Sequence, residues 1–205
     1  MRDAVQADLA SANSRSETDE TQPPGDSGVW VFIVADMGAF ALFFLLFAAG
    51  RIAQPDLYEA SRQQIDAGIG LANTLILLTS GAFMAKAVRA ARIGNRAATL
   101  SGLFLALGVG LLFGVTKAFE WGAKVNHGIG LTTNEFFTYY FVFTGIHFLH
   151  FVVGVGVLLV LIARVRKLEM DAKQLRWVEA GGAYWHMVDL LWIVLFAMIY
   201  LLRAA

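Results

Sequence analysis

The chain has 205 residues, of which 58% are hydrophobic and 16% are charged, whereas about a quarter of the residues of an average soluble domain are charged. This composition predicts an integral membrane protein. The formal net charge is zero, which argues against nucleic acid as a partner, because nucleic-acid-binding proteins present a basic face. The chain contains no cysteine, which excludes disulfides, iron–sulfur clusters, thiol catalysis and cysteine-ligated zinc.

A polar tail comes first in the chain. Residues 1–27 are rich in charged side chains and contain Pro23-Pro24-Gly25 near their end, and such a segment cannot bury a hydrophobic core. We therefore expect a disordered cytoplasmic tail over 1–27, followed by one transmembrane domain over 28–205.

Apolar stretches fill the rest of the sequence. They lie at roughly 28–50, 68–90, 98–122, 135–163 and 180–203. Each is near the ~20 residues that an α-helix needs to cross ~30 Å of hydrocarbon. The predicted fold class is therefore all-α, a polytopic bundle of five transmembrane helices.

The distribution of basic residues predicts the orientation, because lysine and arginine accumulate in cytoplasmic loops. With five spans, the tail and the second and fourth loops share one side, which holds Arg2, Arg15, Lys86, Arg89, Arg92, Arg96, Arg164, Arg166, Lys167, Lys173 and Arg176. The other side holds the smaller set Arg51, Arg62, Lys117, Lys124 and Arg203. The N-terminus is thus predicted to be cytoplasmic and the C-terminus outside. Tyr140 and Tyr200, near outer ends of spans, are interpreted as interfacial anchors.

Ionisable residues inside the spans are candidate functional residues, because such groups are costly in hydrocarbon and need a partner, a cavity or a function. They are Asp36, Glu120, His147, His150, His186 and Asp189. Asp36 has no counter-ion near it in sequence, so either it is protonated or it faces a polar group on another helix or subunit. Glu120 follows Lys117 by three residues, which permits an ion pair that the outer interface keeps solvated. His186 and Asp189 have the same spacing and can form a hydrogen-bonded pair.

Two histidines share a face of the fourth span. His147 and His150 are three residues apart, but a membrane haem carrier needs histidines on separate helices at matching depth. The helical rise places His150 ~20 Å and His186 ~8 Å from the inner ends of their spans, which argues against haem ligation. A b-type haem carrier and a small transporter, the latter suggested by the buried Asp36, are kept as alternatives.

Small residues recur at every fourth position of the third span. Gly102, Ala106, Gly110, Gly114, Ala118 and Gly122 form a stripe that lets a neighbouring helix approach closely. We interpret it first as packing within this bundle, and second as a seam for another subunit. No Ser-His-Asp set, HExxH motif, P-loop or dinucleotide fingerprint is present, so the sequence predicts no catalytic centre and no metal site.

The same polar motifs resemble subunit III of the haem–copper oxidase superfamily. The matching segments are Trp30–Asp36, Asn73–Gly81, Ala118–Glu120, Thr144–His150 and Trp185–Trp192, in family order. The resemblance implies a non-catalytic subunit that binds a haem-bearing catalytic subunit, holds phospholipid in a cleft, and supports assembly, proton uptake and stability in the respiratory chain. Haem and copper would then belong to partner subunits, with phospholipid the only group bound by this chain.

The resemblance also assigns roles to the candidate residues. Asp36 takes the place of the family's intramembrane carboxylate and Glu120 that of its third-span glutamate, while the three intramembrane histidines and Asp189 take structural or lipid-cleft roles. Five spans and an aspartate resemble the quinol oxidase branch and the NorE-type proteins associated with nitric oxide reductase, and residues 131–141 are closer to the NorE type. The implied location is the bacterial inner membrane.

Overall fold

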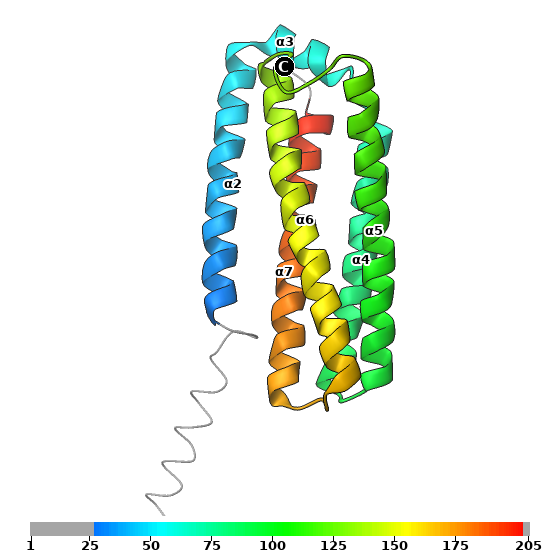
Figure 1. Ribbon diagram of the computed structural model, residues 1–205. Coiled ribbons are helices and arrows are strands. Elements are labelled where there is room, and N and C mark those ends of the chain that lie inside the picture. Colours follow the sequence, from blue (N-terminus) through cyan, green and yellow to red (C-terminus); the bar gives the residue numbers. More distant parts are fainter. Residues whose placement is uncertain (1–26, 203–205) are drawn as a thin grey trace, which may run out of the picture.

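The computed structural model describes residues 27–202, within which every regular element is helical (Figure 1). The elements are α2 (Ser27–Ala53), α3 (Pro55–Arg62), α4 (Ala67–Arg92), α5 (Arg96–Asn126), α6 (Glu135–Lys167), α7 (Ala172–Phe196) and the π-helical turn η1 (Ala197–Leu201). Within residues 27–202, five helices are long and apolar enough to cross a membrane, and the fifth of these combines α7 and η1. The predicted all-α fold with five spans is confirmed. The predicted tail lies outside the described residues except for Ser27, which begins α2.

The helices extend beyond the apolar stretches that predicted them. α7 begins at Ala172, well before residue 180, because the Asp171 carboxylate caps it by accepting a hydrogen bond from the Gln174 amide at 2.7 Å. Asn134 caps α6 in the same way through the Phe137 amide, at 3.0 Å. Hydropathy marks only the part of a helix that lies in hydrocarbon, whereas capping side chains set where the helix starts.

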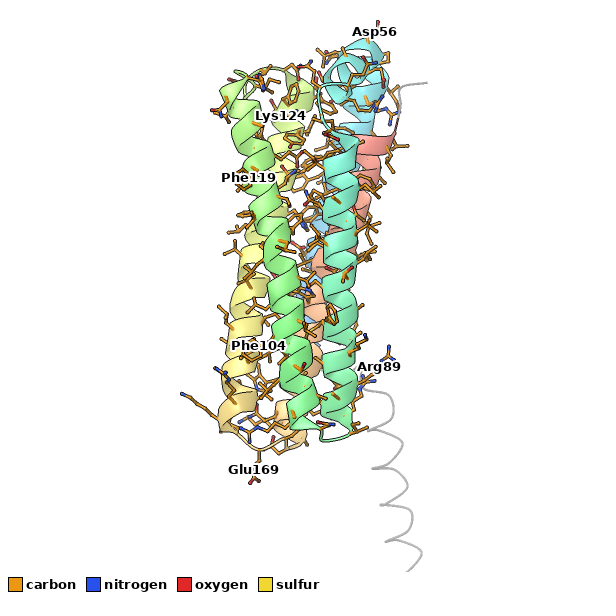
Figure 2. The ribbon with its side chains drawn as sticks, turned by 90° about the vertical axis from the view of Figure 1, so that its right-hand side faces the viewer. Asp56, Arg89, Phe104, Phe119, Lys124 and Glu169 are labelled. Carbon is orange, nitrogen blue, oxygen red and sulfur yellow. The ribbon has the colours of Figure 1, made fainter. Side chains whose placement is uncertain are left out.

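The two ends of the bundle differ in construction. α3 lies across one end, here called the α3 end, and the α4–α5 and α6–α7 connections close the opposite end, here called the loop end (Figure 1). Figure 2 shows charged side chains at both ends, with Asp56 and Lys124 at the α3 end and Arg89 and Glu169 at the loop end. Exposed apolar side chains such as Phe119, 75% exposed, occupy the length between them. This belt is the surface expected of a multi-pass membrane protein.

Polar contacts at the α3 end connect α3 to α6. Tyr58 donates a hydrogen bond to Glu135 at 3.2 Å, and the Asn134 side-chain amide donates to Ser61 at 2.9 Å. Burial, together with the Glu135 carboxylate, raises the pKa of Tyr58 above its ordinary range. The phenol therefore keeps its proton and remains a donor.

α7 is the central helix of the bundle and α2 the least buried. α7 packs against α4, α6 and α2, and 61% of its apolar window is buried, compared with 17% for α2. α2 contacts α6 and α7 along one side only, where Figure 1 shows it at the edge of the bundle. Four helices therefore form the core, and α2 is attached to it.

The small-residue stripe of α5 faces three helices, α4, α6 and α7, over its first four positions, whereas its last two, Ala118 and Gly122, are exposed. A Cβ added at Gly102 would lie 2.9 Å from the Ala87 Cβ on α4, and one at Gly110 would lie 2.8 Å from the Trp185 ring on α7. Ala106 is fully buried, and a Cβ at Gly114 would lie 3.1 Å from Phe151 on α6. These four positions lie against helices of the chain's own bundle.

Candidate functional site

The polar residues at membrane depth lie in two layers. The first, here called the middle layer, contains Asp36, His150, His186 and Asp189. Two hydrogen bonds between helices show that these residues lie at a similar level: the Tyr184 hydroxyl donates to the His150 carbonyl at 3.1 Å, and the Trp185 indole donates to the Ser80 hydroxyl at 3.1 Å. The second, here called the α3-side layer, contains Lys117 and Glu120. Gly110 packs against Trp185 of the middle layer, and Lys117 and Glu120 follow Gly110 by seven and ten residues on α5. At ~1.5 Å per residue this layer lies about 10–15 Å closer to the α3 end.

Asp36 and His150 form an interhelical pair in the middle layer. Asp36 Oδ1 on α2 lies 3.0 Å from His150 Nε2 on α6, and both side chains are 14% exposed. His150 Nδ1 lies 2.8 Å from the Ile146 carbonyl, which can only accept, so Nδ1 carries a hydrogen. The close contact at Nε2 then requires one shared proton, whether it resides on the carboxyl group or on the imidazole. Of the alternatives left open for Asp36, a polar partner on another helix is the one found.

His186 and Asp189 form the second pair of the middle layer. His186 Nδ1 lies 3.5 Å from Asp189 Oδ2, with the histidine side chain 47% exposed and the aspartate side chain 7% exposed. Gly81 on α4 makes room for the carboxylate, since a Cβ there would lie 2.2 Å from Asp189 Oδ2. The other oxygen, Oδ1, is buried without a hydrogen-bond partner in the described chain.

A closed polar cluster forms the α3-side layer. Lys117 Nζ donates to Glu120 at 3.0 Å, to Tyr200 at 2.9 Å and to Tyr140 at 3.3 Å, so all three ammonium hydrogens have acceptors. Both phenols in turn donate to Glu120 Oε1, at 2.7 and 2.6 Å.

Two expectations about this layer are wrong. The lysine and glutamate side chains are 0% and 2% exposed, so they do not form a solvated pair. Tyr140 and Tyr200 are buried as well and are not interfacial anchors. The hydrogen bonds of the two phenols from other helices are what allow the ion pair to be buried.

Each of the three intramembrane histidines has its own surroundings. His147 is fully buried between Phe113 and Trp192, with ring centroids 5.6 and 5.3 Å away, and neither ring nitrogen has a hydrogen-bond partner in the described chain. His150 faces Asp36, and His186 lies beside Asp189. Residues 27–202 hold no cluster of three or more histidine or acidic side chains suited to a metal ion.

The predicted difference in depth between His150 and His186 is wrong. The hydrogen bond from Tyr184 to the His150 carbonyl places the two histidines at nearly the same level. The apolar stretch that starts at residue 180 underestimates the depth of His186. α7 begins at Ala172, so His186 lies near the middle of the span Ala172–Leu201. Depth therefore does not separate these two histidines; His150 faces Asp36 on α2, and His186 lies beside Asp189 on its own helix.

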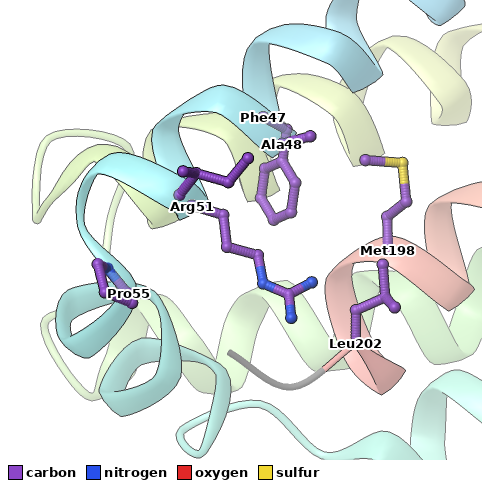
Figure 3. Close-up of a pocket in the computed structure, with 7 residues that line it drawn as sticks. Phe47, Ala48, Arg51, Pro55, Met198 and Leu202 are labelled. Atoms are coloured by element: carbon purple, nitrogen blue, oxygen red, sulfur yellow. The ribbon is translucent and has the colours of Figure 1, made fainter. Parts of the chain in front are cut away.

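A cleft with one cationic side chain lies at the α3 end (Figure 3). It measures about 420 Å³ and is lined by Phe47, Ala48, Arg51, Ile52, Pro55, Met198 and Leu202. Arg51 is the only charged residue of this set, and Figure 3 shows its guanidinium group on the side of Met198 and Leu202. A single cation beside apolar walls suits an anionic head group joined to a hydrocarbon chain.

Comparison with known proteins agrees with this geometry. The family model for cytochrome c oxidase subunit III matches residues 17–203. The chain belongs to the cytochrome c oxidase subunit III family. Subunit III is a component of the haem–copper oxidases, so the resemblance seen in the five sequence segments is confirmed at the level of the family.

Several curated relatives of this subunit III chain cover most of it. Cytochrome c oxidase subunit 3 of Synechocystis sp. is 28% identical over 91% of this chain and 84% of the relative. The horse subunit 3 (Equus caballus) is 30% identical over 84% of this chain and 67% of the relative. The heme-copper oxidase subunit I+III of Aeropyrum pernix is 31% identical over 85% of this chain, and the match spans only 22% of that longer protein.

Some residues of the subunit III site were not identified from sequence. Tyr140 and Tyr200 complete the cluster around Lys117, and Gly81 makes room for Asp189. A signal was available for Tyr140, because it lies on the same face of α6 as the buried Phe136, Phe137, Phe143, Thr144 and His147. No local pattern marked Tyr200, and Gly81 was marked only as the last residue of the matching segment Asn73–Gly81.

Proposed function

We propose that this chain is the non-catalytic subunit III of a bacterial respiratory haem–copper complex, in which it binds the haem-bearing catalytic subunit and stabilises it during turnover. The observation that carries the proposal is the closed arrangement of the polar groups in the α3-side layer. Lys117, the two tyrosines and Glu120 satisfy one another, so they fix α5, α6 and η1 together and leave no group free to act on a substrate. On this proposal haem and copper are held by the partner.

The relative from Aeropyrum pernix supports this choice of partner. Its name gives subunit I and subunit III together, and the segment similar to this chain is joined to a much longer remainder. Family membership likewise favours an accessory subunit over the haem-carrier and transporter alternatives.

The proposal is tested by purifying the tagged full-length chain from native membranes in mild detergent. A haem-bearing subunit identified by mass spectrometry, with a matching haem spectrum in the eluate, is the expected result. Repeated recovery of the chain alone, from membranes whose oxidase activity is intact, would refute it.

The branch of the superfamily is a separate part of the proposal. Five spans and Asp36 favour a quinol oxidase or a NorE-type partner of nitric oxide reductase. Deletion of the gene should then reduce the endurance of either quinol-driven oxygen consumption or nitric oxide consumption. A defect confined to cytochrome c-driven oxygen consumption would contradict this assignment.

A second candidate function is the binding of anionic phospholipid in the Arg51 cleft. The observation that favours it is the single guanidinium group among apolar residues at the end of α2. A basic residue near the membrane surface contributes ~1 kcal/mol to binding of anionic lipid, so Arg51→Gln should lower the copurified anionic lipid about fivefold. Arg51→Lys, which keeps the positive charge at the same place, is the matched control. Equal lipid content in both variants would refute lipid binding at this cleft.

A further inference from the structure

An unusual polar side chain lies on the outer wall of the bundle. His186 is 47% exposed and occupies the middle of the span Ala172–Leu201, about 20 Å from either end at ~1.5 Å per residue. At that depth hydrocarbon offers no hydrogen-bonding partner. An exposed imidazole in this position is costly unless another chain covers it.

A buried carboxylate lies beside this imidazole, and the pair His186 and Asp189 is here called the notch. Asp189 is 5% exposed, and its Oδ1 atom has no hydrogen-bond partner in the described chain. Its other oxygen lies 3.5 Å from His186 Nδ1, so one weak contact is all that compensates the burial of the group. The absence of a side chain at Gly81 is what allows the carboxylate to sit here.

The surroundings of the notch allow a helix to approach. α7 presents Ala183 one turn before His186 and Leu190, 43% exposed, one turn after it. On α4, Ala82 is exposed next to Gly81, and small side chains let helices pack closely in membranes. Lipid head groups lie ~15 Å away from this level, at half the ~30 Å hydrocarbon thickness, so a lipid head group cannot supply a hydrogen-bonding partner for the His186 imidazole.

We propose that the α4–α7 face around His186 and Asp189 is the docking surface for a transmembrane helix of the catalytic subunit, and that a polar side chain of this helix hydrogen-bonds the exposed His186 imidazole. The exposed imidazole selects the occupant, because a polar side chain on a neighbouring transmembrane helix can reach it at this depth, whereas a lipid head group cannot. This inference depends on the proposed function for the identity of the partner, and it adds the face and the chemistry of the contact.

Site-specific photo-crosslinking in the full-length chain tests the proposal. p-Benzoylphenylalanine is placed at Leu190, beside the notch, and as a control at Leu112, which is 52% exposed on α5 at a similar depth. The expected result is a crosslink from position 190, and not from 112, to a transmembrane peptide of the catalytic subunit.

The outcomes separate the two proposals. An intact complex without a crosslink from position 190, equal crosslinking from both positions, or a crosslink from 190 to a second copy of this chain would each overturn the docking surface while leaving the proposed function standing. Recovery of the chain without any catalytic subunit would overturn both.

A variant pair provides an independent measurement. Interhelical hydrogen bonds in membranes are worth enough to change association about 3- to 20-fold, so His186→Ala should lower retention of the catalytic subunit during detergent washing by that factor. His186→Gln keeps an exposed hydrogen-bonding group and should retain more of the partner. Equal retention by both variants and the native chain would overturn the proposal.

Discussion

Removing the negative charge from the α3-side layer should destabilise the protein more than any other single polar change. Glu120→Gln keeps a carbonyl oxygen for Tyr140 and Tyr200 but leaves the Lys117 ammonium group fully buried without a counter-ion. At 3.0 Å and an effective dielectric constant of about 20, the Coulomb energy of the pair is about 5 kcal/mol. Breaking a buried ion pair from one side typically costs about 3–5 kcal/mol, and we expect a loss in that range.

The double variant Lys117→Met/Glu120→Gln is the matched test of this reasoning. It removes both charges and keeps the acceptor for the phenols, and replacing a buried pair by uncharged groups is often neutral or stabilising. Most of the lost stability should therefore return. Unfolding in mixed micelles, followed by tryptophan fluorescence, measures both variants, since Trp121 and Trp192 lie within 6 Å of Lys117 Nζ. A loss of unfolding free energy below about 1 kcal/mol for Glu120→Gln would refute the expected cost of breaking the buried ion pair. A double variant less stable than Glu120→Gln would refute it as well.

Three further outcomes are expected. Asp36→Ala removes the partner of His150 and should lower stability by about 1–3 kcal/mol and speed amide exchange in α2, whereas Asp36→Asn, which can still hydrogen-bond, should be milder; similar exchange in both would count against the pair. Gly110→Ala places a Cβ 2.8 Å from the Trp185 ring and should cost about 1–3 kcal/mol in an unfolding titration, while Gly108→Ala, with nothing within 4 Å, should cost little. Reporters fused to each terminus should place the N-terminus in the cytoplasm and the C-terminus outside, and a cytoplasmic C-terminal reporter would contradict the orientation.

The number and approximate position of the spans could be predicted from the sequence, because hydropathy over some twenty residues reflects a constraint that the bilayer imposes locally. Where each helix begins could not be read in the same way. Asp171, for example, is a polar residue in a charged loop, and its role as the cap of α7 depends on its backbone conformation.

The candidate residues were identified more readily than their partners. The spacing of Lys117 and Glu120 predicts their contact, but not their burial, which depends on tyrosines from α6 and η1. The partner of Asp36 is equally hidden, because His150 belongs to a helix far along the chain and no local pattern connects the two. Contacts between distant segments are set by helix packing, and one sequence alone does not encode that packing in a readable pattern.

The pairing of Asp36 with His150 has a consequence for biosynthesis. α2 is made before α6, the helix that carries the partner of Asp36, and α3, α4 and α5 lie between them in the chain. During insertion the aspartate therefore enters the bilayer alone, at a cost of about 2.5–3.5 kcal/mol if central, which the many Phe, Leu, Ile and Val residues of α2 offset at about 0.3–0.6 kcal/mol each. α2 thus inserts before its partner helix, and its docking through Asp36 has to wait until α6 and His150 have been made.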